Sequence, residues 1–266
     1  MTTPHSAAPE RSVVDRTLSI LGAFDKDNRT LSLSDISRRA GLPVATVHRI
    51  VNKLHLWGAL ERSADGAYSI GLRLWETGAL APRAATLAER ALPHLVTLQS
   101  QSSAAAILAI RDGAEGVCLG FVSGDAEFCG RWGDTGRRVP LHATAVGLVL
   151  LAHASEPVQK EVCAGPLKAY TANTVTDGAL LERSLTKVRR EGHAVVRGTL
   201  SEDRGGFGMP VRDSRGAVIA AVGVFGPVET VQPLRLAPQV RAAADAVSRS
   251  LRADQELSSR GTPATG

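Results

Sequence analysis

The chain has 266 residues, of which 44% are hydrophobic and 21% are charged, and its formal net charge is +5. This composition is ordinary for a globular protein, the length allows two compact cores, and the positive balance is weak evidence for a polyanionic partner. Residues 1–16 lack the apolar core of a signal peptide, and the longest apolar runs, such as residues 143–152, are far short of the roughly 20 residues that span a bilayer. Secreted and membrane proteins are thereby excluded, and we expect a cytoplasmic protein.

Residues 33–52 have the pattern of a helix-turn-helix. Each of two segments carries apolar residues at helical spacing, namely Ile36 and Ala40, then Val47, Ile50, Val51 and Leu54. Gly41 can adopt a positive φ to end the first helix, and Pro43 suits the first turn of the second. A preceding helix over residues 13–25 is expected to pack beneath this motif through Val14, Leu18, Leu21 and Phe24.

The outer face of the second helix has the composition of a DNA reader. Its residues are able to contact bases and phosphates: Val44, Ala45, Thr46, His48, Arg49, Asn52 and Lys53. The segments 60–62 and 68–70 flank an Asp-Gly pair, which predicts a β-hairpin wing. Residues 38–62 hold five Lys and Arg residues against Glu61 alone. We therefore predict a double-stranded DNA site that also includes Arg38, Arg62 and Tyr68, although the two helices alone fit an all-α core equally well.

The remaining elements follow in a clear order. A linker helix over residues 72–82 exposes Leu72, Trp75 and Ala79, which are expected either to contact a second copy of the chain, together with the first helix, or to pack within one chain. A long helix follows from about residue 84 to 100, with Leu87, Ala91, Leu95 and Leu98 on one face.

From residue 103 the apolar period changes to that of strands. Strands are predicted over residues 104–110, 117–122, 127–132 and 218–225, and the last of these follows an apolar segment at 194–196 and a glycine-rich one at 205–211. Residues 140–144 introduce an apolar helix that runs to about residue 154, and further helices are predicted over residues 177–190 and 236–251. The expected second domain is α+β, with helices packed on an antiparallel sheet.

Catalytic interpretations are weaker than structural ones. Ser184 and Lys187 match the S-x-x-K pattern of acyl-transfer enzymes, but the accompanying motifs are missing and the pair lies on a predicted surface helix. Glu202 and Asp203 are neighbours that usually point apart, and His142 is more simply part of a helix start that favours an anion. The three cysteines lack C-x-x-C spacing and are interpreted as buried apolar residues rather than as metal ligands. No metal or cofactor is therefore expected.

Five motifs in unbroken order resemble the IclR family of bacterial transcriptional regulators: SVVDRTLSILGAF, LSDISRRAGLPVATVHRIVNKL, GAYSIGLRL, PLHATAVGLVLLA and PVRDSRGAVIAAVGVFGP. The resemblance implies a winged helix-turn-helix, a linker helix and a GAF-like effector-binding domain, in a homodimer or dimer of dimers on a promoter. The expected boundaries are a disordered tail over residues 1–10, the DNA-binding domain over 11–71, the linker over 72–82, the effector domain over 83–253 and a disordered tail over 254–266.

The chain departs from those relatives that bind small keto or hydroxy acids. They place an acid, a cysteine and two serines near the positions of Val196, Gly206, Gly223 and Phe225, none of which has a polar side chain here. A glyoxylate-sized ligand would lose its hydrogen-bonding partners, so we expect a larger, apolar or aromatic acid. The predicted site comprises Arg131, Trp132, Leu141, His142, Ala143, Thr144, Val196, Gly206, Phe207, Met209, Gly223 and Phe225. If the glycines are only turn residues and Phe225 is core, no ligand pocket remains.

The function predicted from the sequence is therefore a DNA-binding regulator, expected to be a repressor on a near-palindromic operator, that responds to such an acid. The alternative is a small-molecule enzyme or binding protein that carries a helical domain unable to bind DNA. Retention of the chain's own upstream DNA in a gel shift separates the two.

Overall fold

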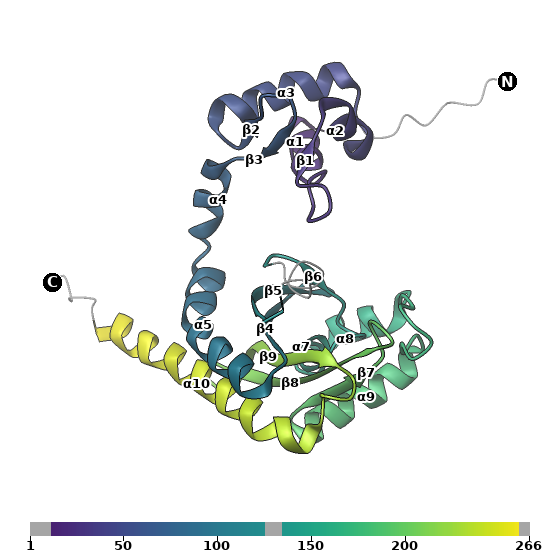
Figure 1. Cartoon of the computed structure of the whole chain (residues 1–266), viewed down its shortest axis with the longest axis vertical. Helices are drawn as coiled ribbons and strands as arrows, with labels where there is room; N and C mark the ends of the chain where they lie inside the picture. Colours follow the sequence, from purple (N-terminus) through teal and green to yellow (C-terminus); the bar gives the residue numbers. More distant parts are fainter. Residues whose placement is uncertain (1–11, 126–134, 261–266) are drawn as a thin grey trace. The chain divides into compact units, whose positions relative to one another are not determined.

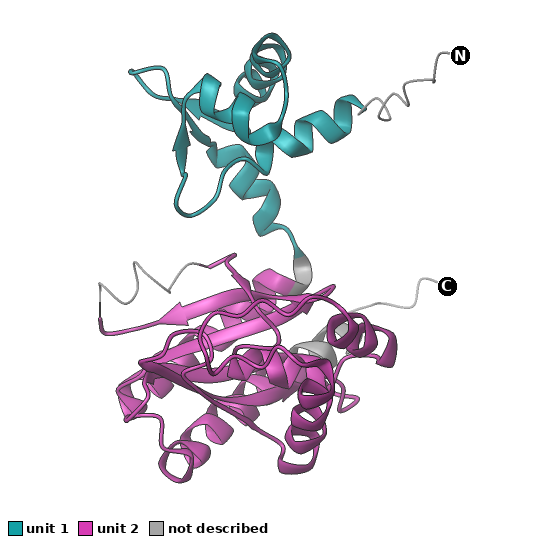
Figure 2. Cartoon of the chain, turned by 90° about the vertical axis from the view of Figure 1, so that its right-hand side faces the viewer, with its two compact units in different colours: residues 1–82 teal, residues 83–266 magenta. Residues whose placement is uncertain are grey.

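The computed structural model describes residues 12–125 and 135–260 (Figure 1). The chain divides into two compact units, residues 1–82 and 83–266, each with its own hydrophobic core (Figure 2). Within the described ranges, no helix has the length and apolar character needed to cross a membrane. The predicted α+β class, with a largely helical first unit followed by a helix-and-sheet unit, is confirmed.

The first unit is a winged helix-turn-helix. Its elements are α1 (Val13–Leu21), β1 (Thr30–Leu31), α2 (Leu33–Ala40), α3 (Val44–Trp57), β2 (Leu60–Arg62), β3 (Tyr68–Ile70) and α4 (Leu72–Ala79). Gly41 ends α2 with a φ of 63°, and Pro43 is the N-cap residue of α3 rather than part of its first turn. The three strands form an antiparallel sheet in the order β1-β3-β2, and the β2–β3 hairpin is the wing.

The face expected to be buried on the first helix is buried only in part, because Leu21 and Phe24 pack against the core of this unit but the earlier positions do not. Ile20 is fully buried, whereas Val14 and Leu18 are 65% and 59% exposed. Val14 and Leu18 lie four residues apart and share a face of α1, so this part of the predicted stripe turns away from the core. An apolar stripe on α1 thus remains on the surface of this unit.

The second unit contains a six-stranded antiparallel sheet in the order β6-β5-β4-β9-β8-β7. Its elements are α5 (Pro82–Ser102), β4 (Ala105–Asp112), β5 (Glu115–Val122), β6 (Arg138–Val139), α7 (Ala145–Ala152), α8 (Glu156–Ala164), α9 (Gly178–Glu191), β7 (Ala194–Arg197), β8 (Arg204–Arg212), β9 (Val218–Pro227) and α10 (Pro233–Arg260). The strand expected over residues 127–132 lies outside the described residues. Neither β6 nor α8 was predicted, and α10 continues past the expected domain boundary at residue 253, because residues 252–257 consist mainly of good helix formers.

Helices cover both faces of this sheet. One core contains the buried faces of α5 and α10, and the other contains α7 with residues of α8 and α9. The stripe predicted for α5 is confirmed, because Leu87, Ala91, Leu95 and Leu98 are all at most 5% exposed. Side chains alternate along β8, so Phe207 and Met209 belong to the α10 side.

A pair of glycines on the other side of the sheet allows α7 to lie directly on the strands. Gly208 and Gly223 are opposite each other in the β8–β9 register. A Cβ atom at Gly208 would lie 3.1 Å from the backbone nitrogen of Val146, and one at Gly223 would lie 3.0 Å from Cγ1 of Val146 and 2.4 Å from the carbonyl oxygen of Phe207. The two glycines therefore fix the height of the first turn of α7 above the sheet.

Candidate functional site

The exposed face of α3 presents the side chains predicted to read DNA. Val47, Ile50 and Val51 are buried, and the opposite face exposes Ala45, His48, Arg49 and Lys53, with Val44 49% exposed and Thr46 and Asn52 half-buried. His48 and Asn52 are joined by a 3.2 Å hydrogen bond between Nε2 and Nδ2. Arg49 and Lys53 form no ion pair with any described residue. Both cations are thus available to phosphates or base edges.

The start of α3 adds backbone donors to this face. Pro43 caps the helix without a side-chain hydrogen bond, and the N–H groups of Val44 and Ala45 have no acceptor within the described residues. The helix itself contains no acidic residue. The positive end of the helix dipole and the free N–H groups therefore favour an anion, such as a DNA phosphate.

Three further residues were predicted to join this face, and the structure gives a different outcome for each. Arg38 is exposed but pairs with Asp35 at 2.6 Å. Tyr68 is only 3% exposed and belongs to the core, where it lies in register with the buried Leu31. Its inclusion in the DNA site is corrected, because the ring is needed to close the core beneath the wing. Arg62 remains exposed, with its guanidinium 5.5 Å from the centre of the Tyr68 ring.

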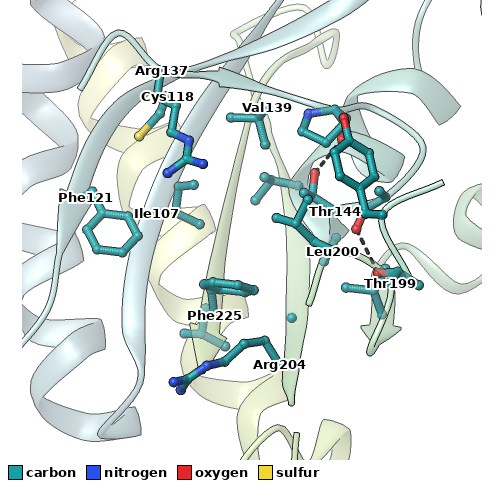
Figure 3. A pocket seen from close by; sticks show the side chains of 18 of the residues that line it. Ile107, Cys118, Phe121, Arg137, Val139, Thr144, Thr199, Leu200, Arg204 and Phe225 are labelled. Carbon is teal, nitrogen blue, oxygen red and sulfur yellow. Dashed lines mark hydrogen bonds between the residues drawn. The ribbon is translucent and has the colours of Figure 1, made fainter. Parts of the chain in front are cut away.

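The second unit contains a cavity of about 190 Å³ at the first turn of α7 (Figure 3). Phe225 of β9 lies between two walls, one formed by Ile107 and Phe121 of β4 and β5 and the other by Thr144 and Leu200. The residues that line the cavity are Ile107, Cys118, Phe121, Arg137, Arg138, Val139, Pro140, Ala143, Thr144, Ala145, Val146, Tyr170, Val196, Thr199, Leu200, Arg204, Gly206, Val224 and Phe225. Most of this surface is aliphatic or aromatic.

The charged groups of the cavity are all cationic. Arg137, Arg138 and Arg204 line it, and no Asp or Glu residue does so among the described residues. Arg138 pairs with Asp112 outside the cavity at 2.6 Å, and Arg204 pairs with Asp203 at 3.0 Å.

The first turn of α7 supplies backbone donors. The hydroxyl of the N-cap residue Thr144 accepts a hydrogen bond from the N–H of Gly147 at 3.1 Å, which leaves the N–H groups of Ala145 and Val146 without an acceptor in the described part of the chain. Together, the helix start and the guanidinium groups make this an apolar cavity suited to an anion.

Threonine hydroxyls hold the loops that form one wall. Thr199 donates to the carbonyl of Ala143 at 2.8 Å, Thr174 donates to the carbonyl of Thr199 at 2.7 Å, and Thr171 donates to the carbonyl of Gly198. Tyr170 lies at the same wall, where burial and the nearby Glu115 carboxylate raise the pKa of its hydroxyl. The wall is therefore fixed by hydrogen bonds between segments that are distant in sequence.

The predicted effector residues divide into three groups. Ala143, Thr144, Val196, Gly206 and Phe225 line the cavity, whereas Arg131 and Trp132 lie outside the described residues. The other five do not line it, which corrects the prediction for Leu141, His142, Phe207, Met209 and Gly223.

Each of these corrections has a physical cause. Phe207 and Met209 point to the opposite side of the sheet, and Gly223 lies beneath α7. Leu141 is core, and Nε2 of the buried His142 makes a 2.9 Å hydrogen bond with the carbonyl of Lys168.

Models of known protein families match both units of the chain. The model of the bacterial transcriptional regulator IclR C-terminal domain matches residues 81–249, and that of the IclR helix-turn-helix domain matches residues 13–64. The chain belongs to the IclR family. IclR proteins are transcriptional regulators rather than enzymes, so this chain is a regulator with a helix-turn-helix domain and an effector-binding domain.

Relatives of this IclR chain match it over nearly its whole length. The glycerol operon regulatory protein of Streptomyces griseus is 33% identical over 90% of this chain and 95% of its own length. The HTH-type transcriptional repressor AllR of Klebsiella pneumoniae is 29% identical and 92% of each chain is covered. The crystal structure of an IclR homolog from Microbacterium hydrocarbonoxydans complexed with 4-hydroxybenzoate has a TM-score of 0.85 at 35% identity, covering 91% of this chain and 100% of that one.

The catalytic alternatives find no support in the geometry of this IclR chain. The Ser184 hydroxyl donates to the carbonyl of Leu180 in its own helix at 3.0 Å, while Asp203 accepts a hydrogen bond from Ser201 and pairs with Arg204. Among the described residues, no group of three His, Cys, Asp or Glu side chains is placed to hold a metal ion.

Sequence reasoning missed Arg137, Arg204 and Phe121, whose approach to the cavity depends on long-range strand pairing. The sequence offered one signal for the two arginines, namely a basic residue that stands next to a glycine-rich or apolar strand.

Proposed function

We propose that this chain is a repressor that binds a near-palindromic operator as a homodimer or dimer of dimers, and that its effector is a monocyclic aromatic carboxylate. The observation that carries the ligand class is the cavity at the start of α7. It combines an apolar lining with three arginines and a helix N-terminus, and its described lining has no acidic side chain.

The size of the cavity supports a single ring. An apolar cavity of about 150 Å³ accepts benzene, and the cavity here, at about 190 Å³, leaves room for one carboxylate and a small substituent. Ile107, Phe121 and Phe225 provide faces for the ring, while the N–H groups of Ala145 and Val146 provide donors for the carboxylate. The relative from Microbacterium, which was crystallised with 4-hydroxybenzoate, supports the same class.

Different observations support dimerisation and repression. One winged helix-turn-helix contacts too few bases for specificity, so two half-sites are expected. Val14, Leu18 and Trp75 are 65%, 59% and 66% exposed and offer apolar surface to a second copy. The Klebsiella relative is named a repressor. A monomer in sedimentation that footprints an asymmetric site would contradict the dimer, and higher promoter output with the protein bound would contradict repression.

The effector is tested by thermal shift and by operator binding. We expect 4-hydroxybenzoate and benzoate, but not glyoxylate or pyruvate, to stabilise the protein by about 2.7 kcal/mol at a hundred times the dissociation constant. Binding to the chain's own upstream DNA should weaken as the same acids are added.

Variants locate the ligand. Ile107→Phe, which fills the cavity, and Arg204→Met, which removes a cation, should each abolish the response, whereas Arg111→Met on the outside of β4 should leave it unchanged. A response to glyoxylate or pyruvate without one to aromatic acids would overturn the proposed ligand class. A normal response in Ile107→Phe would overturn the proposed location.

A further inference from the structure

A second hollow lies on the opposite side of the sheet, between α10 and the end of β8. Its volume is about 380 Å³, and it shares no lining residue with the cavity at α7. The lining residues are Gly192, Met209, Pro210, Arg212, Arg241, Ala244, Asp245, Ser248, Arg249 and Arg252. The family assignment and the proposed effector leave this hollow without a role.

Positive charge dominates the hollow. Among the described side chains, four guanidinium groups line it against one carboxylate, that of Asp245. Arg241, Arg249 and Arg252 lie along one side of α10, and none of the three forms an ion pair or hydrogen bond with a described residue. All three side chains are exposed, so an anion can reach them from solvent.

Hydrogen bonds join the two elements that form the hollow. The backbone N–H of Arg212 donates to Oγ of the buried Ser248 at 3.0 Å, and that hydroxyl donates to the carbonyl of Ala244 at 2.7 Å. This ties the end of β8 to α10. Arg212 is held further by a 2.9 Å hydrogen bond from its guanidinium to the carbonyl of Gly216. The backbone frame and Arg212 are therefore in place before a ligand binds, whereas the exposed side chains of Arg241, Arg249 and Arg252 become ordered on binding.

We propose that this hollow, which we call the arginine hollow, binds a small multivalent oxyanion of the phosphate-ester or pyrophosphate class. Guanidinium groups bind such oxygens through paired hydrogen bonds, and several anionic oxygens are needed to engage more than one arginine. A volume of about 380 Å³ suits a small molecule rather than an extended polymer. The chain would then respond to a phosphorylated metabolite in addition to its effector.

Inorganic pyrophosphate is the probe, titrated into the full chain by calorimetry at constant ionic strength. We expect one saturable site per chain and at least about a tenfold weaker affinity in the double variant Arg241→Gln/Arg249→Gln. The matched control Arg111→Gln/Arg183→Gln removes the same charge from exposed positions outside the hollow and should bind as the unmodified chain does. A second control, Arg49→Ala/Lys53→Ala, removes the cations of α3 and should also bind normally.

The outcomes are distinct. Loss of affinity only in the α10 double variant supports the proposal. The absence of saturable binding, equal losses in both glutamine variants, or a loss only in the α3 variant would overturn it. Weaker operator binding by the α10 variant, without pyrophosphate binding by the unmodified chain, would assign the arginines to DNA instead and would also overturn it.

Discussion

Gly223→Ala tests whether the glycine pair positions α7. The new Cβ atom would lie 2.4 Å from the carbonyl oxygen of Phe207 and 3.0 Å from Cγ1 of Val146. The first of these neighbours is backbone within a central strand pair, so it cannot move without disturbing the β8–β9 ladder. Overpacking of this kind typically costs 1–3 kcal/mol, and we expect about 3 kcal/mol here because the nearest contact is with backbone.

The matched control is Gly226→Ala on the same strand. A Cβ atom there meets only Cβ of Ala104 and the hydroxyl of Thr230, both at 3.4 Å, which is ordinary contact. By differential scanning calorimetry, Gly223→Ala should lower the melting temperature of the second unit by about 6–12 °C, at roughly 2–4 °C per kcal/mol, and the control should change it little. Equal melting temperatures for the two variants would refute the role assigned to the glycine pair.

Three further predictions concern DNA binding and pH. Arg49→Ala should weaken operator binding by about 1–3 kcal/mol. Lys53→Ala should instead weaken binding to all DNA sequences similarly and lower the slope of log affinity against log salt concentration by about one. Anisotropy titrations at several salt concentrations measure both effects. Tyr68→Phe should keep operator affinity because the ring is buried, while Arg62→Ala should reduce it; equal effects in the same titrations would contradict the core assignment of the tyrosine. Burial, with smaller contributions from two nearby arginines, lowers the pKa of His153 in the folded state, so the unfolded chain takes up the proton first and stability falls as the pH drops below about 6.5. His153→Gln should flatten that fall in melting temperatures recorded between pH 7.5 and 5.

The sequence predicted most reliably what depends on local periodicity and turn chemistry. The buried stripe of α5, the inner face of α3 and the left-handed turn at Gly41 all follow from spacing within one segment. The helix start at Thr144 was also predicted from residue types alone. These features need no knowledge of partners elsewhere in the chain.

The features that the sequence did not predict depend on which face of a helix or strand packs against which neighbouring helix or strand. The apolar positions of α1 predicted one inner face, whereas packing against α2 and α3 buries Ile20 and leaves Val14 and Leu18 exposed. In the same way, the sequence placed Gly206 and Phe207 in one site, whereas alternation along β8 puts them on opposite sides of the sheet. Arg137 and Arg204 lie 67 positions apart in the numbering and line one cavity through long-range pairing that no local pattern encodes.

In the proposed effector site, the two ends of the ligand are recognised by different kinds of groups. The carboxylate faces backbone N–H groups of Ala145 and Val146, which are present whatever side chains stand there, and the ring faces side chains such as Ile107 and Val196. Over evolutionary time, a lineage can therefore exchange one ring-shaped effector for another by single substitutions at the apolar end and still recognise an acid. The residues least free to vary would be Gly208 and Gly223, which no ligand touches but which hold that backbone in place.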